Sequence, residues 1–284
     1  YGVGIGLVGM YVLSRIDYHL WKKLIPFALG ATLIALILVK IPGIGFSANG
    51  ATRWIHLGPL FFQPSELAKL AVVMYLASWM SERGHTSGFW QSVFPPVMII
   101  SIYSLLILWQ PDLGTMIAIV LTSAIMLFAG GIKLKYFAWL SAAGTAIMLL
   151  LIKLEPYRVQ IITAFLNKSV DPLGIGYQIN QALIAIGSGG WFGYGYGHSR
   201  QKYSYLPEAI NDSIFAVMAE ELGFIRILLI LGVFALFLAR GIYISYGAPD
   251  LFGKIMAVGL IGGIASAAIV NISAITGLLP LTGI

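Results

Sequence analysis

Four carboxylates crowd one short segment at the entrance of a strongly apolar stretch, between Tyr205 and Gly223: Glu208, Asp212, Glu220 and Glu221. An ionisable group at the hydrocarbon boundary of a membrane costs about 2.5 to 3.5 kcal/mol on insertion scales and needs a partner or a water-filled cavity. A function is therefore the default expectation. If the segment is helical from residue 208, Asp212 lies one turn after Glu208 on the same face. Glu220 then lies about 80° away and about 12 Å deeper, and Glu221 points the other way.

Two interpretations of Asp212 follow from this spacing. In the functional one, Asp212 is a base or a ligand at the boundary between water and membrane, and Glu220 is a buried relay or a structural partner. In the structural one, Asp212 or Asn211 only caps a transmembrane helix, and Glu208 favours the positive N-terminus of that helix. Spacing alone leaves both open.

A second group of candidate residues lies between Asn49 and Lys69. Pro64 and Glu66 are typical of a helix start, because proline fits the first helical position and an acidic side chain favours the positive end of the helix dipole. Lys69 opposes that dipole unless it pairs with an anion such as Glu66, Asp212 or a ligand phosphate. Trp54 is more simply explained as an aromatic anchor at the membrane surface.

Other polar residues admit both roles as well. Asp112 could bind a metal or orient a loop, but its position before an apolar run favours an N-cap. Arg158, Arg200 and Lys202 are candidates to hold phosphates, although each of them could be a solvated charge or could face lipid headgroups.

The composition excludes an ordinary soluble domain, because only 10% of the residues are charged and 59% are hydrophobic, with a mean hydropathy of +0.90. It predicts an all-α polytopic membrane protein with roughly eight spans. The first run rises only about 21 Å, so we expect the sequence to begin inside a span. Cysteine is absent, which excludes disulfides and thiolate metal sites, and no nucleic-acid-binding pattern is present. The predicted spans are residues 2 to 14, 24 to 41, 64 to 81, 93 to 109, 113 to 131, 136 to 153, 213 to 239 and 254 to 275.

Basic residues in alternate loops predict the orientation, since cytoplasmic loops carry an excess of Lys and Arg. We therefore expect residues 42 to 63, the turn at 110 to 114 and the long segment from 154 to 212 to face outward. That last segment contains an apolar helical stretch, Tyr177 to Ile186, and a glycine-rich run that permits close backbone approach. The sequence predicts one membrane domain, residues 1–284, with one elaborated outer loop, residues 154–212. The basic loop residues are Arg15, Lys22, Lys23, Arg83, Lys133, Lys135, Arg240 and Lys254.

Several long motifs resemble the SEDS family, which includes FtsW, RodA and SpoVE, and the similarity runs nearly end to end. The stretch Leu206-Pro-Glu-Ala-Ile-Asn-Asp-Ser-Ile-Phe215 is closer to FtsW than to RodA. The other matching segments are Arg15-Ile-Asp17, residues 49–69, Gln110-Pro-Asp-Leu-Gly-Thr115, residues 177–190 and residues 271–283.

The resemblance implies about ten spans, so we expect the first and the last to lie outside this sequence. It also implies a peptidoglycan glycosyltransferase that polymerises lipid II at the outer face of the bacterial cytoplasmic membrane. The expected partners are a class B penicillin-binding protein and the proteins of a division or elongation complex. The essential aspartate of the family falls on Asp212, and its motif residues fall on Trp54, Glu66 and Lys69. Where many relatives carry a second arginine after Arg158, this chain has Ile161.

The expected chemistry needs only one carboxylate. A sugar leaving group must be protonated, but a pyrophosphate leaving group needs only positive charge or a divalent metal such as Mg or Mn. We therefore expect Asp212 to be the general base of an inverting transfer that releases undecaprenyl pyrophosphate. Lys69, Arg53 and either Arg200 or Lys202 would hold the pyrophosphate.

Two other functions stay open at this stage. A lipid II flippase would need polar groups across the whole membrane, whereas only Glu220 and Glu221 go deeper than the outer side. A noncatalytic division scaffold would tolerate Asp212→Asn.

Overall fold

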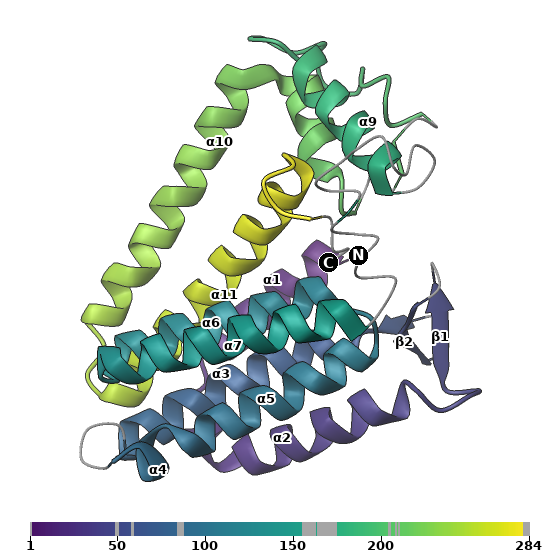
Figure 1. Cartoon of the computed structure of the whole chain (residues 1–284). Coiled ribbons are helices and arrows are strands. Elements are labelled where there is room, and N and C mark those ends of the chain that lie inside the picture. The colour runs from purple at the N-terminus through teal and green to yellow at the C-terminus, as the bar shows by residue number, and fades with distance from the viewer. Residues whose placement is uncertain are drawn as a thin grey trace.

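The computed structural model describes residues 2–48, 51–57, 60–83, 88–154, 163, 175–203, 206, 207, 209 and 211–280. The fold is mostly helical (Figure 1). In the described part of the chain, three helices are long and apolar enough to cross a membrane: α2 (Leu20–Leu38), α10 (Ile214–Tyr246) and α11 (Leu251–Ile275). Shorter apolar helices are α1 (Gly2–Ser14), α5 (Phe94–Trp109) and α6 (Leu113–Ala129). The described part also contains α3 (Pro64–Arg83), α4 (Phe89–Ser92), α7 (Leu134–Leu154) and α9 (Ile175–Ser188).

The main core lies where α2, α3, α5, α6 and α11 pack together (Figure 1). Glycines let α11 approach its neighbours closely, since a Cβ at Gly259 would lie 2.6 Å from the Sδ atom of Met126. The buried Tyr103 hydroxyl joins α5 to α2 by donating to the carbonyl oxygen of Leu29 at 2.7 Å. Tight packing and an interhelical hydrogen bond are what hold apolar helices together in a membrane. α11 is therefore fixed in the bundle along much of its length.

A small antiparallel sheet follows α2, in the strand order β1-β2-β3. Its strands are β1 (Gly45–Ala48), β2 (Ala51–Leu57) and β3 (Leu60–Phe62). Phe46 pairs with Trp54 across the first two strands, and Ile55 pairs with Phe62 across the next two. The all-α prediction missed this sheet. Its strands are short, and aromatic and β-branched residues form the cross-strand pairs that stabilise them only once the strands meet.

The helix α10 stands apart from the rest of the bundle. Figure 1 shows α10 and α11 diverging from their shared turn, with α9 beside the far end of α10. Non-helical backbone at Gly223 divides α10 into a short first part and a long second part. A second, smaller core joins α9, the first part of α10 and the end of α11: Ile179, Ala182, Ala185, Leu206, Ala216, Val217 and Ile275.

A polar latch closes the opposite end of the bundle, away from the sheet (Figure 1). The Tyr18 hydroxyl, just before α2, donates a short hydrogen bond to Asp250, which caps α11 through the Gly253 amide at 3.3 Å. The Asp250 carboxylate raises the pKa of Tyr18 to about 12. Burial opposes ionisation of Asp250, but the bond from Tyr18 and nearby positive charge hold its pKa below the usual range. The latch ties the α1–α2 connection to the start of α11.

Candidate active site

The two deeper carboxylates of the acidic cluster bind the loop formed by residues 197–202. Glu220 is buried, with 1% of its surface exposed. Its Oε2 atom accepts from the hydroxyl of Ser199 at 2.5 Å, and its Oε1 atom accepts from the amide of Arg200 at 3.0 Å. The amide of Gln201 also points to it, at 3.4 Å. Hydrogen bonds of this kind compensate for burying the carboxylate.

Glu221 holds the same loop from the neighbouring position. It accepts hydrogen bonds from the amides of Gly197, at 2.9 Å, and Ser199, at 3.2 Å. The Nζ atom of Lys202 lies 2.7 Å from Glu221 and 2.8 Å from the carbonyl oxygen of Gly197. Its hydrogen bond to Glu221 raises the pKa of Lys202. The predicted directions of Glu220 and Glu221 assumed one helix from residue 208, whereas α10 begins at Ile214 and the loop contacts both side chains.

Main-chain hydrogen bonds join the break in α10 to the glycine-rich run. The amides of Tyr194 and Gly195 donate to the carbonyls of Glu220 and Glu221, at 3.1 and 2.9 Å. Beyond the break, the amide of Phe224 donates to Gly190 at 2.9 Å, and that of Ile225 donates to Trp191 at 3.2 Å. Backbone groups of a broken helix must find partners inside a membrane protein. We call residues 189–195 and 220–225 together the splice.

Glycine is required where the two halves of the splice touch. Gly193 and Gly223 both have φ of 75°, a region that other residues rarely adopt. A Cβ at Gly223 would lie 2.3 Å from the amide nitrogen of Gly193, and one at Gly189 would lie 2.1 Å from the carbonyl oxygen of Ala219. The glycines predicted to permit close backbone approach therefore do so against α10.

Asp212 lies in a turn that precedes α10. The helix begins at Ile214 with Ser213 at its N-cap, so Asp212 stands outside it and the predicted helix from residue 208 is too long. The structural interpretation, in which Asp212 or Asn211 is the cap, is wrong by one or two positions. The carbonyl oxygen of Asp212 accepts from the Nδ2 atom of Asn271 at 3.2 Å. The turn is thus fixed to the end of α11.

Ser213 fixes the other side of this turn. Its hydroxyl is fully buried and donates to the carbonyl oxygen of Pro207 at 3.0 Å. It also receives a hydrogen bond from the side chain of Gln178, in α9, at 3.3 Å. Together with Asn271, these contacts connect the turn carrying Asp212 to both α9 and α11.

A groove of about 240 Å³ lies between α3, α6 and α11, with an ion pair on its wall. Lys69 Nζ lies 2.8 Å from Glu66 Oε1, which is one of the anions expected to offset the helix dipole. The groove wall formed by α11 includes Ala267. Asn271 follows Ala267 by one helical turn, a rise of about 6 Å. The groove therefore extends along α11 towards the Asp212 turn. Its lining is completed mainly by apolar residues, with Thr122 and Ser123 as further polar members.

Arg53 and Asp112 meet at the turn between α5 and α6. The guanidinium of Arg53 donates to the carbonyls of Gln110, at 3.3 Å, and Pro111. Asp112 is buried and accepts from the amide of Thr115 at 3.1 Å, so the expected N-cap of α6 is present. Burial raises the pKa of Asp112, while the charge of Arg53 and the bond from Thr115 oppose that rise. Both residues fix the turn at the start of α6, one of the helices that line the groove.

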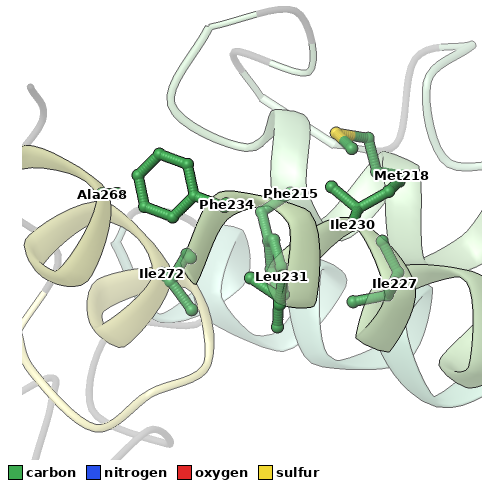
Figure 2. A pocket seen from close by; sticks show the side chains of 8 residues that line it. All are labelled: Phe215, Met218, Ile227, Ile230, Leu231, Phe234, Ala268 and Ile272. Carbon is green, nitrogen blue, oxygen red and sulfur yellow. The ribbon is translucent and has the colours of Figure 1, made fainter. Parts of the chain in front are cut away.

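An apolar groove of about 170 Å³ lies between the two parts of α10 and the end of α11. Figure 2 shows Phe215 and Met218 from the first part of α10 facing Ile227 and Leu231 from the second. Phe215 follows Asp212 by three residues. An apolar surface thus begins about one helical turn from the carboxylate. The lining is completed by Ile230, Phe234, Ala268 and Ile272.

The sequence model of the FtsW/RodA/SpoVE family, described as cell cycle protein, matches residues 2–284. The chain belongs to this family. Stage V sporulation protein E of Bacillus subtilis (strain 168) is 43% identical over 282 residues, which cover 99% of the chain and 77% of that relative. A probable peptidoglycan glycosyltransferase FtsW from Geobacter sp. (strain M18) is 41% identical over 282 residues, with the same coverage of both chains.

Solved structures show the same fold. A chain of a peptidoglycan synthase complex, in a study of coordinated polymerization and crosslinking, superimposes with a TM-score of 0.81 at 28% identity. This similarity covers 99% of the chain and 79% of that structure. The rod shape determining protein RodA of Thermus thermophilus gives a TM-score of 0.68 at 26% identity, covering 99% and 76%. The resemblance to this family is therefore confirmed.

The predicted site residues fall into different surroundings. Arg158 and Glu208 lie outside the described residues. The Arg200 guanidinium lies over the ring of Tyr194, 5.3 Å from its centroid. Trp54 is half-buried in β2. The substrate-binding roles of these residues stay predictions.

Sequence reasoning missed the residues that hold the Asp212 turn: Asn271, Gln178 and Ser213. All three stand inside motifs that matched the family, but nothing in their spacing connects them. The one available signal was Asn271 itself, because an amide in an apolar span is costly unless it has a partner.

The described residues offer no cage for a divalent cation, since no group of three or more His, Asp or Glu side chains in that part of the chain is arranged to hold a metal ion. Mg²⁺ is commonly held by one or two carboxylates together with substrate phosphates. A metal site made by protein groups alone therefore does not fit the described part, and no step below passes through a metal.

Proposed function

We propose that the chain is a peptidoglycan glycosyltransferase that polymerises lipid II, with Asp212 as the general base. One observation carries the assignment to Asp212. The main chain of Asp212 is hydrogen-bonded to Asn271 of α11. Asn271 lies one helical turn after the part of α11 that lines the groove with Glu66 and Lys69. A base must be held within hydrogen-bond reach of the proton that it takes. The activity itself is supported by the family and by relatives that carry this name.

The reaction balances with one carboxylate. The acceptor hydroxyl oxygen attacks the anomeric carbon of the donor while Asp212 takes the hydroxyl proton. The bond between the anomeric carbon and the phosphate oxygen breaks, and its electron pair leaves with undecaprenyl pyrophosphate. Because the attack is opposite to the leaving group, the configuration inverts. The leaving group needs no proton, only positive charge nearby.

The cations available for the pyrophosphate differ in their surroundings. Lys69 reaches the groove and, among the described residues, is paired with Glu66 at a partly exposed position. Lys202 already binds Glu221 and Gly197, and Arg53 binds main-chain carbonyls. Lys69 is therefore the first candidate and Arg200 the second, with Arg158, Arg53 and Lys202 following. The polyprenyl tail would lie on the apolar groove that begins at Phe215, since its chemistry matches that lining.

The setting of the reaction belongs to the same proposal. The protein would act in the bacterial cytoplasmic membrane, crossing it about eight times in this sequence, with the Asp212 side facing outward. Its partner would be a class B penicillin-binding protein in a division or elongation complex, which fits the similarity to a peptidoglycan synthase complex. Mg²⁺ or Mn²⁺ would enter together with the substrate phosphates.

The test is polymerisation of lipid II by full-length protein and its transpeptidase partner in proteoliposomes. We expect Asp212→Asn to lower the rate roughly 10²- to 10⁴-fold, which is the usual contribution of a general base. Asp17→Asn is the matched control, the same change at an exposed aspartate near the polar latch. A wild-type rate for Asp212→Asn would remove the base assignment. Lipid II translocation without polymerisation would instead favour a flippase, and normal growth supported by Asp212→Asn would favour a noncatalytic scaffold.

A further inference from the structure

Asn271 is an amide in the last part of an otherwise apolar helix. α11 is long and apolar enough to span a membrane, and a polar side chain there needs a partner. Its Nδ2 atom donates to the carbonyl oxygen of Asp212, 59 residues earlier in the chain, at 3.2 Å. We infer that Asn271 is a positioning residue that holds Asp212 in place for proton transfer. The inference rests on the proposed function, in which Asp212 is the base.

The contact reaches the main chain of Asp212. It therefore sets the position of the Cα atom and leaves the carboxylate side chain unaltered. Asp212 lies in the turn before the first residue of α10. Asn271 on one side and Ser213 on the other supply that placement, the latter through Pro207 and Gln178.

Asn271 and Ser213 connect the turn to different helices, α11 and α9. Ser213 and Gln178 link it to α9 and to the smaller core, which stands with α10. Asn271 links it to α11, which is packed into the main bundle through close contacts such as Gly259 against Met126. The Asn271 bond thus connects Asp212 directly to the helix that forms one wall of the groove carrying Glu66 and Lys69.

Loss of this bond should slow the reaction more than it weakens substrate binding. The lipid and phosphate surfaces belong to the two grooves, and Asn271 lines neither of them. General-base catalysis, however, depends on the base lying at hydrogen-bond distance, and a displacement of about 1 Å can cost about 10²-fold in rate. The expected signature is a lower kcat at nearly constant KM.

The experiment uses full-length protein with its transpeptidase partner in proteoliposomes, with lipid II as substrate. Asn271→Leu keeps the volume of the side chain and removes the donor. We expect kcat to fall roughly 10- to 100-fold, with KM and the thermal midpoint close to wild type. Asn271→Gln keeps an amide donor and should recover part of the rate. Ser273→Ala is the control on the same helix and should retain the wild-type rate.

A second variant provides a pH readout that a structural role alone would not give. In Asn271→Asp, the ionised carboxylate can only accept hydrogen bonds, whereas the protonated carboxyl can donate one to the Asp212 carbonyl. Its deficit relative to wild type should shrink as the pH falls through the pKa of the new carboxyl. The deficit of Asn271→Leu should not change with pH. This arm remains informative if Asn271→Leu fails to fold.

The outcomes separate the inference from the proposed function. Wild-type activity of Asn271→Leu beside an inactive Asp212→Asn would overturn the inference alone. Equal losses of rate and thermal midpoint in Asn271→Leu and Ser273→Ala would also overturn it, because they would indicate general destabilisation. Wild-type activity of Asp212→Asn would overturn the assignment of the base, and the inference with it.

Discussion

The turn that carries Asp212 and the loop bound by Glu220 and Glu221 are two acidic regions of one short segment, built in opposite ways. In the loop, buried carboxylate oxygens accept hydrogen bonds from main-chain amides, a hydroxyl and an ammonium group. In the turn, the surrounding protein holds the main chain, through Asn271 on one side and Ser213 on the other. A carboxylate that accepts buried hydrogen bonds supports the fold, whereas the Asn271 contact holds Asp212 by its main chain and does not occupy the carboxylate.

The carboxylates of this cluster also differ in how much water they lose when the protein folds. A buried carboxylate is tolerated when hydrogen bonds replace the water that it loses. Glu220 and Glu221 are buried and compensated in this way. Asp212 is only half-buried, at the edge of the fold. We therefore expect stability to depend on the first two residues and activity to depend on the third.

The largest expected effect comes from Glu220→Ala. It leaves the buried hydroxyl of Ser199 and the part-buried amide of Arg200 without their acceptor, and a fully buried donor left unsatisfied costs about 1 to 3 kcal/mol. We expect a total loss of about 3 kcal/mol or more, measured by thermal unfolding of the purified protein. Asp212→Asn keeps the size of the side chain and the main-chain contact with Asn271, so it should lower stability less than Glu220→Ala does. An equal loss of stability in the two variants would contradict the view that the loop carboxylates support the fold while Asp212 serves the reaction.

A somewhat smaller loss of stability is expected from Gly223→Ala, which places a side chain inside the splice next to the loop. The new Cβ would lie 2.3 Å from the amide nitrogen of Gly193, at a φ of 75°. The backbone conformation at φ 75° and ψ 172° is essentially restricted to glycine and alone costs about 1 to 3 kcal/mol for another residue, and the main chain must also shift. Gly232→Ala is the matched control in the same helix, where the Cβ would meet no atom within 4 Å. Thermal unfolding should separate the two, and similar midpoints would show that the splice is not strained.

Lys202→Met tests how much of the loop depends on charge. Glu221 keeps two main-chain donors in this variant, so the thermal midpoint should fall less than for Gly223→Ala. The pKa of Lys202 is raised in the folded protein, so its contribution is complete below its usual value of 10.5 and is lost as the pH rises through the folded pKa. The difference between wild type and Lys202→Met should therefore disappear in strongly alkaline solution. A difference that persists there would indicate packing of the Lys202 stem instead.

The smallest effect is expected far from both acidic regions, at the polar latch. Tyr18→Phe removes the hydrogen bond to Asp250 and should lower the thermal midpoint slightly without changing polymerisation. The folded pKa of Tyr18 is about 12, against 10.0 unperturbed, so its contribution is present below pH 10 and is lost as the pH rises through about 12. Asp250 has a lowered pKa, so its contribution is lost as the pH falls through that value. Midpoints recorded against pH for both proteins provide the check.

Much of the helical fold could be predicted from the sequence, because long apolar runs are strong signals. The helices fall on the predicted segments, although the number of spans stays a prediction. α10 begins at Ile214 and extends to Tyr246, where the sequence predicted residues 213 to 239. The break at Gly223 could not be predicted, because it depends on contact with Gly193, a residue distant in the chain.

The candidate site was predictable only in part. The Glu66–Lys69 pair lies within one helix, so its spacing was enough to suggest it. The Asn271 contact spans α10 and α11, and periodicity says nothing about which side chains meet across such a distance. The roles of Glu220 and Glu221 depend on the path of residues 197–202, which a glycine-rich sequence leaves open.

The splice also has a consequence for biosynthesis. A helix broken at Gly223 exposes main-chain groups that the hydrocarbon core cannot solvate, and residues 189–195 are their partners. These partners precede α10 in the chain, so they leave the ribosome before the break does. The first part of α10 can therefore enter the membrane with its complement already synthesised. Reversing this order, for example by circular permutation between Gly195 and Gly223, should leave nascent chains stalled at the translocon and open to proteolysis.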